Sequence, residues 1–388
     1  MTPTGKVLIL DGMWSKTVAA VRSLGRHGLK VTAGEVTRLA AALFSRHAAL
    51  RAVYPSPVTE PRAFLAWLDR ELDKGYDAVL PFETVTQEFL AVHRTRIESR
   101  TRFPFAPLQA MRLMGDKAET TKMAAALGLP IPRTVHPHSV EEAALILKDF
   151  PAPAVVKPRT SSGTRGLRYV SRAEDLWPAY RDVHVRHPFP IVQERIPPGG
   201  EAIGVGALYN KGKARALFAF KRLREYPVTG GSSTLRMSVR HPEAEAAAER
   251  LLDSIGWHGP AMVEFKAHPS DGRPRFLEVN PRFWGSLSLA IRAGVDFPWL
   301  LYRMAVDGDI EPVRDYRTGV VVRSIVPGEI LHFLTRRGRV RSEIPAEARR
   351  GRGGDDLISL EDPLPVIGRV LSLFPLLTRS DLRRILSN

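Results

Sequence analysis

Phe276-Leu277-Glu278-Val279-Asn280-Pro281-Arg282 is the stretch that most constrains the fold of this protein. It reads as one short strand, on which side chains two residues apart point the same way, so a carboxylate, an amide and a guanidinium share a face. A second predicted strand, Ala261–Phe265, carries Glu264. Paired side by side, the two strands would direct Glu264, Glu278 and Asn280 toward one point. Such oxygen ligands suit Mg²⁺, which usually binds one or two carboxylates together with nucleotide phosphates.

Composition places the chain among ordinary globular proteins. Its 388 residues are 44% hydrophobic and 25% charged, which is enough apolar material for two or three domains. The absence of Cys excludes disulfides, thiolate zinc sites and cysteine nucleophiles, and it is compatible with a cytoplasmic location, which we expect. Met1–Leu10 contains no apolar stretch long enough for a signal peptide. The apolar segment Val366–Leu377 is too short to span a bilayer.

The formal net charge of +16 raises the question of an anionic partner. The excess is mostly Arg scattered along the chain, and the densest clusters, at 336–341 and 349–352, lack the interleaved aromatic residues of a base-stacking surface. We therefore do not expect a nucleic acid as partner, and a solvated basic surface is the favoured interpretation. Peripheral association of Leu371–Leu386 with an anionic membrane surface stays open as an alternative.

The N-terminal third alternates strand and helix patterns, as at the start of a doubly wound α/β sheet. The predicted elements are the strand Val7–Leu10, the helix Val18–Leu24, the strand Lys30–Thr32, the helix Phe64–Leu72 and the strand Ala78–Pro81. The loop after the last strand carries Glu83 and Thr84, and ligands bind at such strand ends. Gly12–Thr17 lacks the glycine spacing of a Walker loop, so we interpret Lys16 as a helix-start residue.

A second segment begins near Leu113, where Asp116 is expected to cap a helix that ends before Gly128. The further predicted elements are the helix Val140–Leu147 and the strands Ala154–Pro158, Leu167–Val170 and Ile191–Glu194. From Arg314 onward the sequence is Arg-rich and poorly periodic until a last predicted helix, Arg379–Leu386.

Ser161-Ser162-Gly163-Thr164-Arg165-Gly166 joins two of these strands and should be a flexible hairpin tip. Glycines and hydroxyl residues let backbone N–H groups approach phosphate oxygens closely. Lys157 lies four residues before Ser161, on an apolar strand where a buried charge needs an anionic partner. The lysine and the loop could therefore contact the same phosphates.

Taken in order, these motifs resemble the ATP-grasp superfamily over roughly Leu113–Ile310, and within it the carboxylate–amine ligase branch. The residues that carry the resemblance are Asp116-Lys117, Val156-Lys157-Pro158, the Gly-rich loop, Val192-Gln193-Glu194, Glu201, Glu264 and Glu278–Arg282. The fold class that it implies is α/β, with α+β character. It implies a doubly wound pre-ATP-grasp domain (1–112), an ATP-grasp nucleotide-binding and catalytic module (113–312) with a mobile lid at about 131–192, and a C-terminal basic extension (313–388).

The resemblance also implies roles for individual residues, with ATP and Mg²⁺, or else Mn²⁺, as cofactors. The expected nucleotide contacts are Lys117 and Lys157 at the phosphates, the lid loop residues Ser161, Ser162, Gly163, Thr164 and Gly166, Glu194 and the backbone of Ile196 at the adenine edge, and Glu201 at the ribose. The expected metal ligands are Glu264, Glu278 and Asn280. Arg282 and Lys157 are the expected catalytic residues, with Arg282 beside the transferred phosphoryl group and the substrate carboxylate.

The implied activity is ATP-dependent joining of a small-molecule carboxylate to an amine, with an amino acid or peptide on one side. An acyl phosphate would form first, and an amide or peptide bond, ADP and phosphate would result. In-line phosphoryl transfer needs cations around the equatorial oxygens, and a lid protects an acyl phosphate from water. Glu83 and Thr84 are candidates to shape the acceptor pocket, and a homodimer is compatible with the sequence.

Several alternatives remain open at this point. Glu264 and Glu278 could instead be cross-strand partners of arginines such as Arg275, and Lys266 could be an active-site cation or an exposed lysine. His241 and His258 are interpreted as caps or packed side chains rather than bases. At the level of the whole protein, ATP-dependent carboxylation through carboxyphosphate and a non-catalytic nucleotide-binding regulator are the competing readings.

Overall fold

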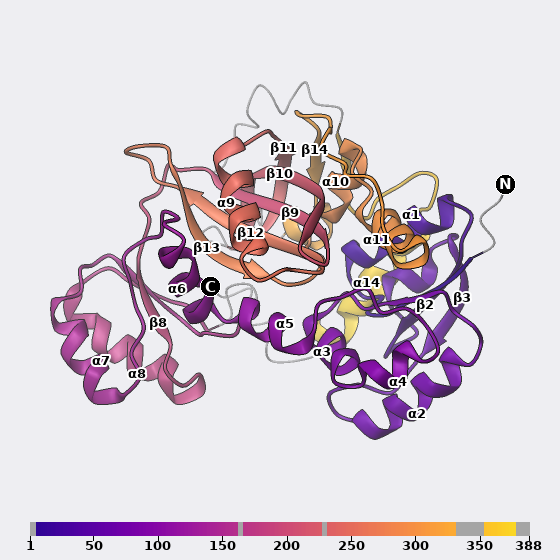
Figure 1. Ribbon diagram of the computed structural model, residues 1–388, viewed down its shortest axis with the longest axis horizontal. Helices are drawn as coiled ribbons and strands as arrows, with labels where there is room; N and C mark the ends of the chain where they lie inside the picture. The colour runs from indigo at the N-terminus through magenta and orange to yellow at the C-terminus, as the bar shows by residue number, and fades with distance from the viewer. Residues whose placement is uncertain (1–4, 162–165, 227–230, 331–352, 378–388) are drawn as a thin grey trace.

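The computed structural model describes residues 5–161, 166–226, 231–330 and 353–377, which form three β-sheets with flanking helices (Figure 1). The N-terminal sheet has four parallel strands in the order β3-β2-β1-β4. Its strands are β1 (Lys6–Ile9), β2 (Lys30–Glu35), β3 (Ala48–Val53) and β4 (Ala78–Leu80). Its helices are α1 (Ser15–Arg26), η1 (Ala41–Phe44), α2 (Pro61–Leu72), α3 (Thr84–Val92) and α4 (Arg94–Glu98). The predicted parallel α/β opening is confirmed, because buried runs such as Val7–Ile9 are covered on both faces.

A small unit follows and projects to one side of the molecule (Figure 1). Its antiparallel sheet has the order β5-β8-β6-β7. The strands are β5 (Thr134–Val135), β6 (Ala154–Lys157), β7 (Arg168–Val170) and β8 (Ile191–Glu194). The helices are α7 (Val140–Ile146), η2 (Leu147–Asp149), η3 (Ala173–Asp175) and α8 (Leu176–Arg186). This unit has its own hydrophobic core, built around Phe150, Leu176 and Tyr180.

The largest sheet has seven strands in the order β13-β12-β9-β10-β11-β14-β15. Its strands are β9 (Ala202–Asn210), β10 (Lys213–Tyr226), β11 (Ser232–Ser238), β12 (Gly259–Ala267), β13 (Pro274–Asn280), β14 (Val321–Arg323) and β15 (Gly353–Asp355). The helices α9 (Pro242–Asp253), α10 (Leu287–Ala293) and α11 (Phe297–Asp307) accompany it. Two further helices, α5 (Leu108–Gly115) and α6 (Lys117–Ala126), link the N-terminal sheet to the small unit. As predicted, Asp116 caps α6 by accepting from the backbone N–H of Ala118 at 2.8 Å.

The N-terminal sheet and the seven-stranded sheet share one core. At the junction between them the rings of Phe82 and Phe283 stack with centroids 4.8 Å apart. This contact matters for function because Phe82 precedes the Glu83 loop and Phe283 follows Arg282. The two loops are therefore fixed relative to each other by buried aromatic packing.

The C-terminal region differs from the expectation of little regular structure before Arg379. Residues beyond Arg314 contribute β14 and β15 to the seven-stranded sheet, a short helix η4 (Ile325–Glu329) and the helix α14 (Leu364–Leu377). α14 packs against η1 of the N-terminal region. Short parallel strand pairs have little sequence signal, since β14 and β15 are three residues each. The predicted helix Arg379–Leu386 lies outside the described residues, and the boundary at 313 stays a prediction.

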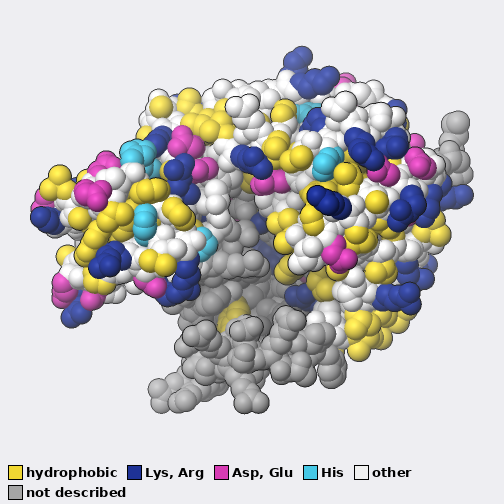
Figure 2. Space-filling model, turned by 90° about the horizontal axis from the view of Figure 1, so that it is seen from below, with side chains coloured by type: hydrophobic (Ala, Val, Ile, Leu, Met, Phe, Trp, Pro, Cys, Tyr) yellow, Lys and Arg dark blue, Asp and Glu magenta, His cyan; other side chains and the backbone are white. Residues whose placement is uncertain are grey.

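Side chains of both charge signs are interspersed with apolar ones on the face shown in Figure 2. Among the described helices, none combines the length and the apolar character needed to cross a bilayer.

Candidate functional site

Two carboxylates meet on neighbouring strands of the large sheet. Glu264 on β12 lies directly opposite Glu278 on β13, and Met262 lies opposite Asn280. The Asn280 Nδ2 atom is 3.1 Å from Glu264 Oε1 and 3.5 Å from Glu278 Oε1. The strand pairing predicted from the sequence is confirmed, and its register places the three side chains together.

Two lysines from outside this sheet approach the carboxylates. Lys117, the first residue of α6, is buried, and its Nζ lies 3.1 Å from Glu278 Oε2. Lys157 ends β6 in the small unit, and its Nζ donates to Gln193 Oε1 at 2.6 Å. Helix α6 and strand β6 belong to different parts of the chain, so the site forms where three elements converge. Gln193, buried on β8, positions Lys157; the sequence analysis named it within the Val192-Gln193-Glu194 motif but gave it no role.

Arg222 is a further member of the site that the sequence analysis missed. It lies on β10, and its Nη2 is 2.5 Å from Glu264 Oε2, while its Nη1 is 3.3 Å from Glu225 Oε1. The nearby carboxylates, although opposed by burial, raise the pKa of Arg222, so it stays charged. A signal was available, because Arg222 lies two residues after the apolar run Ala216–Phe220 on one long strand, where a buried charge needs a partner.

The surroundings shift the pKa values of the two carboxylates in opposite directions. Burial raises the pKa of Glu264 above its ordinary value, and the pairing with Arg222 opposes this only in part. Burial also opposes ionisation of Glu278, but Lys117 and Lys157 outweigh it and hold its pKa below the ordinary value. Burial lowers the pKa of Lys157 to about 8, against the attraction of Glu278. Glu278 is thus the carboxylate held firmly as an anion.

The start of the Gly-rich loop joins this cluster. The Ser161 carbonyl accepts from Lys117 Nζ at 2.6 Å, and the Ser161 hydroxyl is buried without a hydrogen-bond partner among the described residues. Gly166, at the other end, has a φ of 76°, and a Cβ there would lie 2.9 Å from Pro158. The predicted contacts Ser162, Gly163 and Thr164 lie outside the described residues.

Arg282 links the carboxylates to the N-terminal sheet. Its Nη2 donates to Asn280 Oδ1 at 3.2 Å and its Nε donates to Thr84 Oγ1 at 3.1 Å. Glu83, next to Thr84, pairs with Lys16 Nζ at 2.7 Å. The loop that the sequence analysis chose from its place after β4 is therefore adjacent to Arg282.

Lys16 is more than a helix-start residue. It does lie in the first turn of α1, but it is buried, and its Nζ donates to the Phe82 carbonyl at 2.5 Å. Burial and the nearby Arg282 lower the pKa of Lys16 to about 8, while Glu83 opposes the shift. Lys16 therefore connects the Glu83 loop to α1. This contact joins residues far apart in the sequence, so no local sequence pattern could predict it.

Glu194 and Glu201, the residues expected at the adenine and the ribose, each contact another part of the chain. Glu194 ends β8, and its Oε2 accepts from the backbone N–H of Arg133 at 3.3 Å. Ile196 is buried two residues later. Glu201 precedes β9 and pairs with Lys221 Nζ at 2.8 Å. Their predicted roles remain predictions.

The donor set fits Mg²⁺ when phosphates supply the remaining ligands. No group of three or more His, Asp or Glu side chains is gathered for a metal within the described ranges. Two carboxylates are what Mg²⁺ takes from a protein when it also binds phosphate oxygens. The Asn280 amide presents its nitrogen to both carboxylates and its oxygen to Arg282, so a half-turn of the amide would add a third oxygen. The buried Ser161 hydroxyl beside Lys117 is a further polar group suited to a phosphate.

Three other predictions can be compared with the structure. His241 is a cap, since its Nδ1 accepts from the Ala244 backbone N–H at 3.3 Å at the start of α9. His258 is half-buried, and burial lowers its pKa to about 4, which agrees with a packed side chain rather than a base. Lys266 is half-buried, two residues beyond Glu264 on β12, and its role stays open.

One family model and several curated proteins match parts of this chain. The family model described as "ATP-grasp in the biosynthetic pathway with Ter operon" matches residues 191–326. The D-alanine–D-alanine ligase of Anaeromyxobacter sp. (strain K) is 31% identical over 172 residues, which cover 41% of this chain and 54% of that protein. The chain thus spans about half of that ligase, and it spans only 8 to 30% of other, longer curated relatives.

Solved structures show the same fold at low sequence identity. The biotin carboxylase domain of Hydrogenobacter thermophilus 2-oxoglutarate carboxylase, solved with MgADP, ADP and bicarbonate, aligns with a TM-score of 0.66 at 20% identity, covering 81% of this chain and 73% of that chain. The L-amino acid ligase from Bacillus licheniformis aligns with a TM-score of 0.60 at 19% identity, covering 80% and 78%. The mixed parallel and antiparallel architecture expected from the sequence is therefore confirmed.

Proposed function

We propose, on the premise that this chain belongs to the ATP-grasp superfamily, that it is an ATP-dependent ligase joining a carboxylate to an amine. The products would be an amide or peptide bond, ADP and phosphate, formed through an acyl phosphate. The similarity to a D-alanine–D-alanine ligase in sequence and to an L-amino acid ligase in fold supports an amino acid or peptide as substrate.

The observation that carries this proposal is the convergence of two lysines on two opposed carboxylates. Lys117 reaches Glu278 from α6, and Lys157 reaches toward it from β6, while Glu264 faces Glu278 across the sheet. A site with buried cations and anions side by side is suited to a charged polyphosphate together with its counter-ion. A purely structural ion pair would not need both lysines and a second carboxylate.

In this proposal the lysines bind the phosphates of ATP and keep them in line with the attacking oxygen. Glu264, Glu278 and Asn280 would hold Mg²⁺, which when bound neutralises charge on the transferred phosphoryl group. Mg²⁺ is the preferred ion because the donors are all hard oxygens, and Mn²⁺ fits the same set. Lys157, lowered in pKa but cationic at neutral pH, supplies positive charge in a place of low dielectric.

Arg282 is proposed to orient the carboxylate substrate. Its guanidinium is already fixed by Thr84 and Asn280, so its remaining N–H donors have a defined direction. The neighbouring Glu83 carboxylate is partly exposed and could receive an ammonium group of the acceptor. An arginine and a glutamate on neighbouring loops would suit a substrate that carries both charges.

The small unit between 134 and 194 is the proposed lid. It has a core separate from the rest of the protein, and a unit with its own core can move as a rigid body. Closure would bring β6 with Lys157 and the loop around Ser161 over the phosphates and exclude water from the acyl phosphate. Glu194, the Ile196 backbone and Glu201 would contact the adenosine from the hinge side. Glu201 would have to exchange Lys221 for ribose hydroxyls, and exposed ion pairs of this kind open easily.

The test is a screen of carboxylate and amine pairs for ADP formation, with the mass of the product as the readout. Single carboxylates, single amines and pairs are compared, because a ligase requires both. ADP that forms only with a pair, together with a product of the summed mass less water, supports the proposal. ATP hydrolysis that is indifferent to every pair would contradict it.

A second candidate is ATP-dependent carboxylation, and the fold similarity to a biotin carboxylase domain solved with bicarbonate favours it. In that reaction bicarbonate takes the place of the carboxylate, and carboxyphosphate takes the place of the acyl phosphate. Incorporation of label from bicarbonate into a product, measured without acidification because N-carboxylates lose CO₂ in acid, distinguishes the two reactions.

A further inference from the structure

A second cleft lies on another part of the molecule. Its volume is about 1350 Å³, and its walls are α1, α10, residues 316–320 and residues 353–361. Four arginines line it, namely Arg22, Arg26, Arg292 and Arg317. None of the residues that surround Glu278 is among its lining residues, so it is distinct from the proposed catalytic site.

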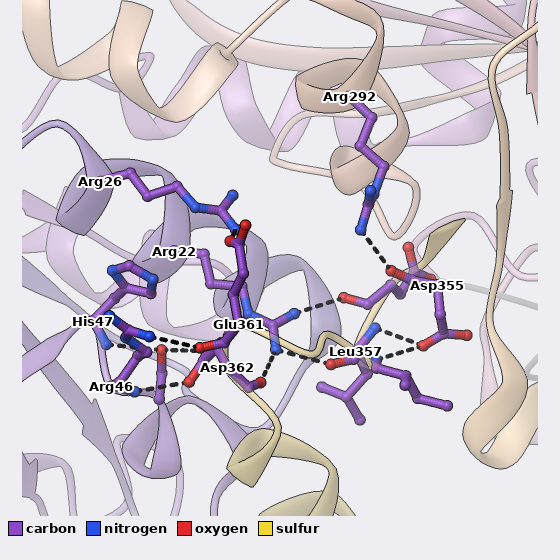
Figure 3. Close-up of polar contacts among 12 residues, drawn as sticks. Arg22, Arg26, Arg46, His47, Arg292, Asp355, Leu357, Glu361 and Asp362 are labelled. Carbon is purple, nitrogen blue, oxygen red and sulfur yellow. Dashed lines mark hydrogen bonds and ion pairs between the residues drawn. The ribbon is translucent and has the colours of Figure 1, made fainter. Parts of the chain in front are cut away.

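The acidic residues in the walls already have partners (Figure 3). Both oxygens of Asp355 accept from backbone N–H groups, and the three donors are Ile325 at 2.8 Å, Leu357 at 2.8 Å and Ile358 at 2.7 Å. Asp356 is almost fully buried and forms an ion pair with the buried Arg236. These two carboxylates hold the walls together and do not neutralise the exposed arginines.

Two of the four arginines are also committed. Arg22 is buried and donates from Nε to Asp362 Oδ2 at 2.8 Å and from Nη2 to the Leu357 carbonyl at 2.9 Å. Arg26 pairs with Glu361 at 2.6 Å, but both of these side chains are exposed. The first pair is structural, whereas the second can open at little cost in free energy.

Arg292 and Arg317 have no carboxylate partner among the residues that the structure describes. Arg317 Nη2 donates to the Arg292 backbone carbonyl at 2.5 Å, and Arg292 Nη2 lies 3.4 Å from the Asp355 carbonyl. A guanidinium has five N–H donors, so most of the donors of each arginine remain available. The backbone contacts restrict the position of each guanidinium. They do not cancel its charge, because a carbonyl group is neutral.

Gly354 leaves space in the cleft wall for the side chain of Arg292. A Cβ at Gly354 would lie 2.6 Å from Arg292 Cζ, so only glycine lets the guanidinium rest on this stretch of backbone. Figure 3 shows Arg292 extended from α10 toward this segment. A guanidinium held in this position, with no carboxylate partner among the described residues, can donate two parallel hydrogen bonds to an oxyanion.

We propose that this cleft binds a small polyanion whose phosphate or carboxylate oxygens are held by Arg292 and Arg317. Planar guanidinium groups suit both kinds of oxyanion because each donates two parallel hydrogen bonds. Arg26 becomes a third contact when its pair with Glu361 opens. The ligand is small because the cleft, at about 1350 Å³, is somewhat larger than a typical small-molecule pocket and far too small for a folded partner.

The test is calorimetric titration of the full chain with pyrophosphate and, separately, with tricarballylate, in the presence of saturating ADP. ADP occupies the nucleotide site but leaves the position beside Arg282 open, so binding in the cleft is identified by its loss in a variant of the cleft arginines. The cleft variant is R292Q/R317Q, and the matched control is R62Q/R70Q, which removes two exposed arginines of α2 and changes the net charge equally.

We expect at least one probe to bind the parent and the R62Q/R70Q control alike, with affinity roughly tenfold or more weaker in R292Q/R317Q. Preference for pyrophosphate would identify a phosphate ligand, and preference for tricarballylate a carboxylate ligand. If neither probe binds, if R292Q/R317Q binds as tightly as the parent, or if both double variants weaken binding equally, the proposal is overturned. Should R292Q/R317Q fail to fold, G354A gives the decision, since it displaces the Arg292 guanidinium and changes no charge. ADP affinity, measured first, reports on the catalytic site separately.

Discussion

Glu264 and Glu278 stand opposite each other on β12 and β13, yet each is held by a different cation. Arg222 lies 2.5 Å from Glu264, and Lys117 lies 3.1 Å from Glu278. The pKa of Glu264 is raised by burial, whereas the lysines hold the pKa of Glu278 down. The two carboxylates are therefore not equivalent, and Glu278 is the one prepared to act as an anion without help from a metal.

Replacement of Glu278 by Gln should lower the rate of ADP formation by at least about 100-fold, the scale seen when one group that stabilises charge at a reacting centre is removed. The amide keeps the shape of the side chain but removes the anion that faces Lys117. Steady-state ADP release, measured over a range of Mg²⁺ concentrations, checks this. Glu243→Gln, an exposed glutamate of α9 paired with Arg273, is the control. A Glu278→Gln enzyme that ligates at the parent rate would refute the metal assignment.

Replacement of Arg282 by Lys should reduce kcat for ligation by roughly 10- to 100-fold while leaving ADP affinity unchanged. Lysine keeps the charge but cannot contact Thr84 and Asn280 at once, so the substrate carboxylate loses its orientation. Thr84→Val, which removes one of these contacts, should have a smaller effect in the same direction. Equal losses of kcat and of ADP affinity would instead indicate a general disturbance of the site.

Lys16 should give the protein a pH-dependent stability above neutrality. Its pKa is lowered by burial from 10.5 to about 8, so between these values the unfolded chain binds more protons than the folded chain. The free energy of unfolding of the parent should therefore rise with pH across this window relative to Lys16→Met, by at most about 3 kcal/mol. Below pH 8 the difference between the two proteins should be constant. Urea unfolding at a series of pH values measures it, and a flat difference throughout would mean that Lys16 titrates normally.

Two arginines of α1 should differ sharply in their contribution to stability. Arg22→Met leaves Asp362 buried without its cation and should cost about 3–5 kcal/mol of unfolding free energy. Arg26→Gln breaks the exposed pair with Glu361 on the same helix and should have little effect. Urea unfolding of both variants under one set of conditions gives the comparison. If Arg22→Met is as stable as Arg26→Gln, the C-terminal segment is not fastened by this pair.

Most of the N-terminal sheet, the small unit and the β12–β13 pair could be predicted because their signals are local. Buried runs such as Val7–Ile9 and capping by Asp116 act within a few residues. The region 314–377 could not be predicted in the same way. β14 and β15 are short, and what stabilises them is pairing with β11 and with each other, which depends on residues far away in the chain.

The sequence by itself determined that Glu278 and Asn280 would share one face of a strand, because side-chain direction alternates along any extended chain. The same expectation for Arg282 was wrong, since β13 ends at Asn280 and the chain bends before Arg282. Only the tertiary structure decided that Arg222 would meet Glu264, that Lys16 would meet Glu83, and that Arg292 and Arg317 would line one cleft. Those contacts join residues between 25 and 67 positions apart. Their geometry follows from strand register and the packing of distant elements, which no local periodicity encodes.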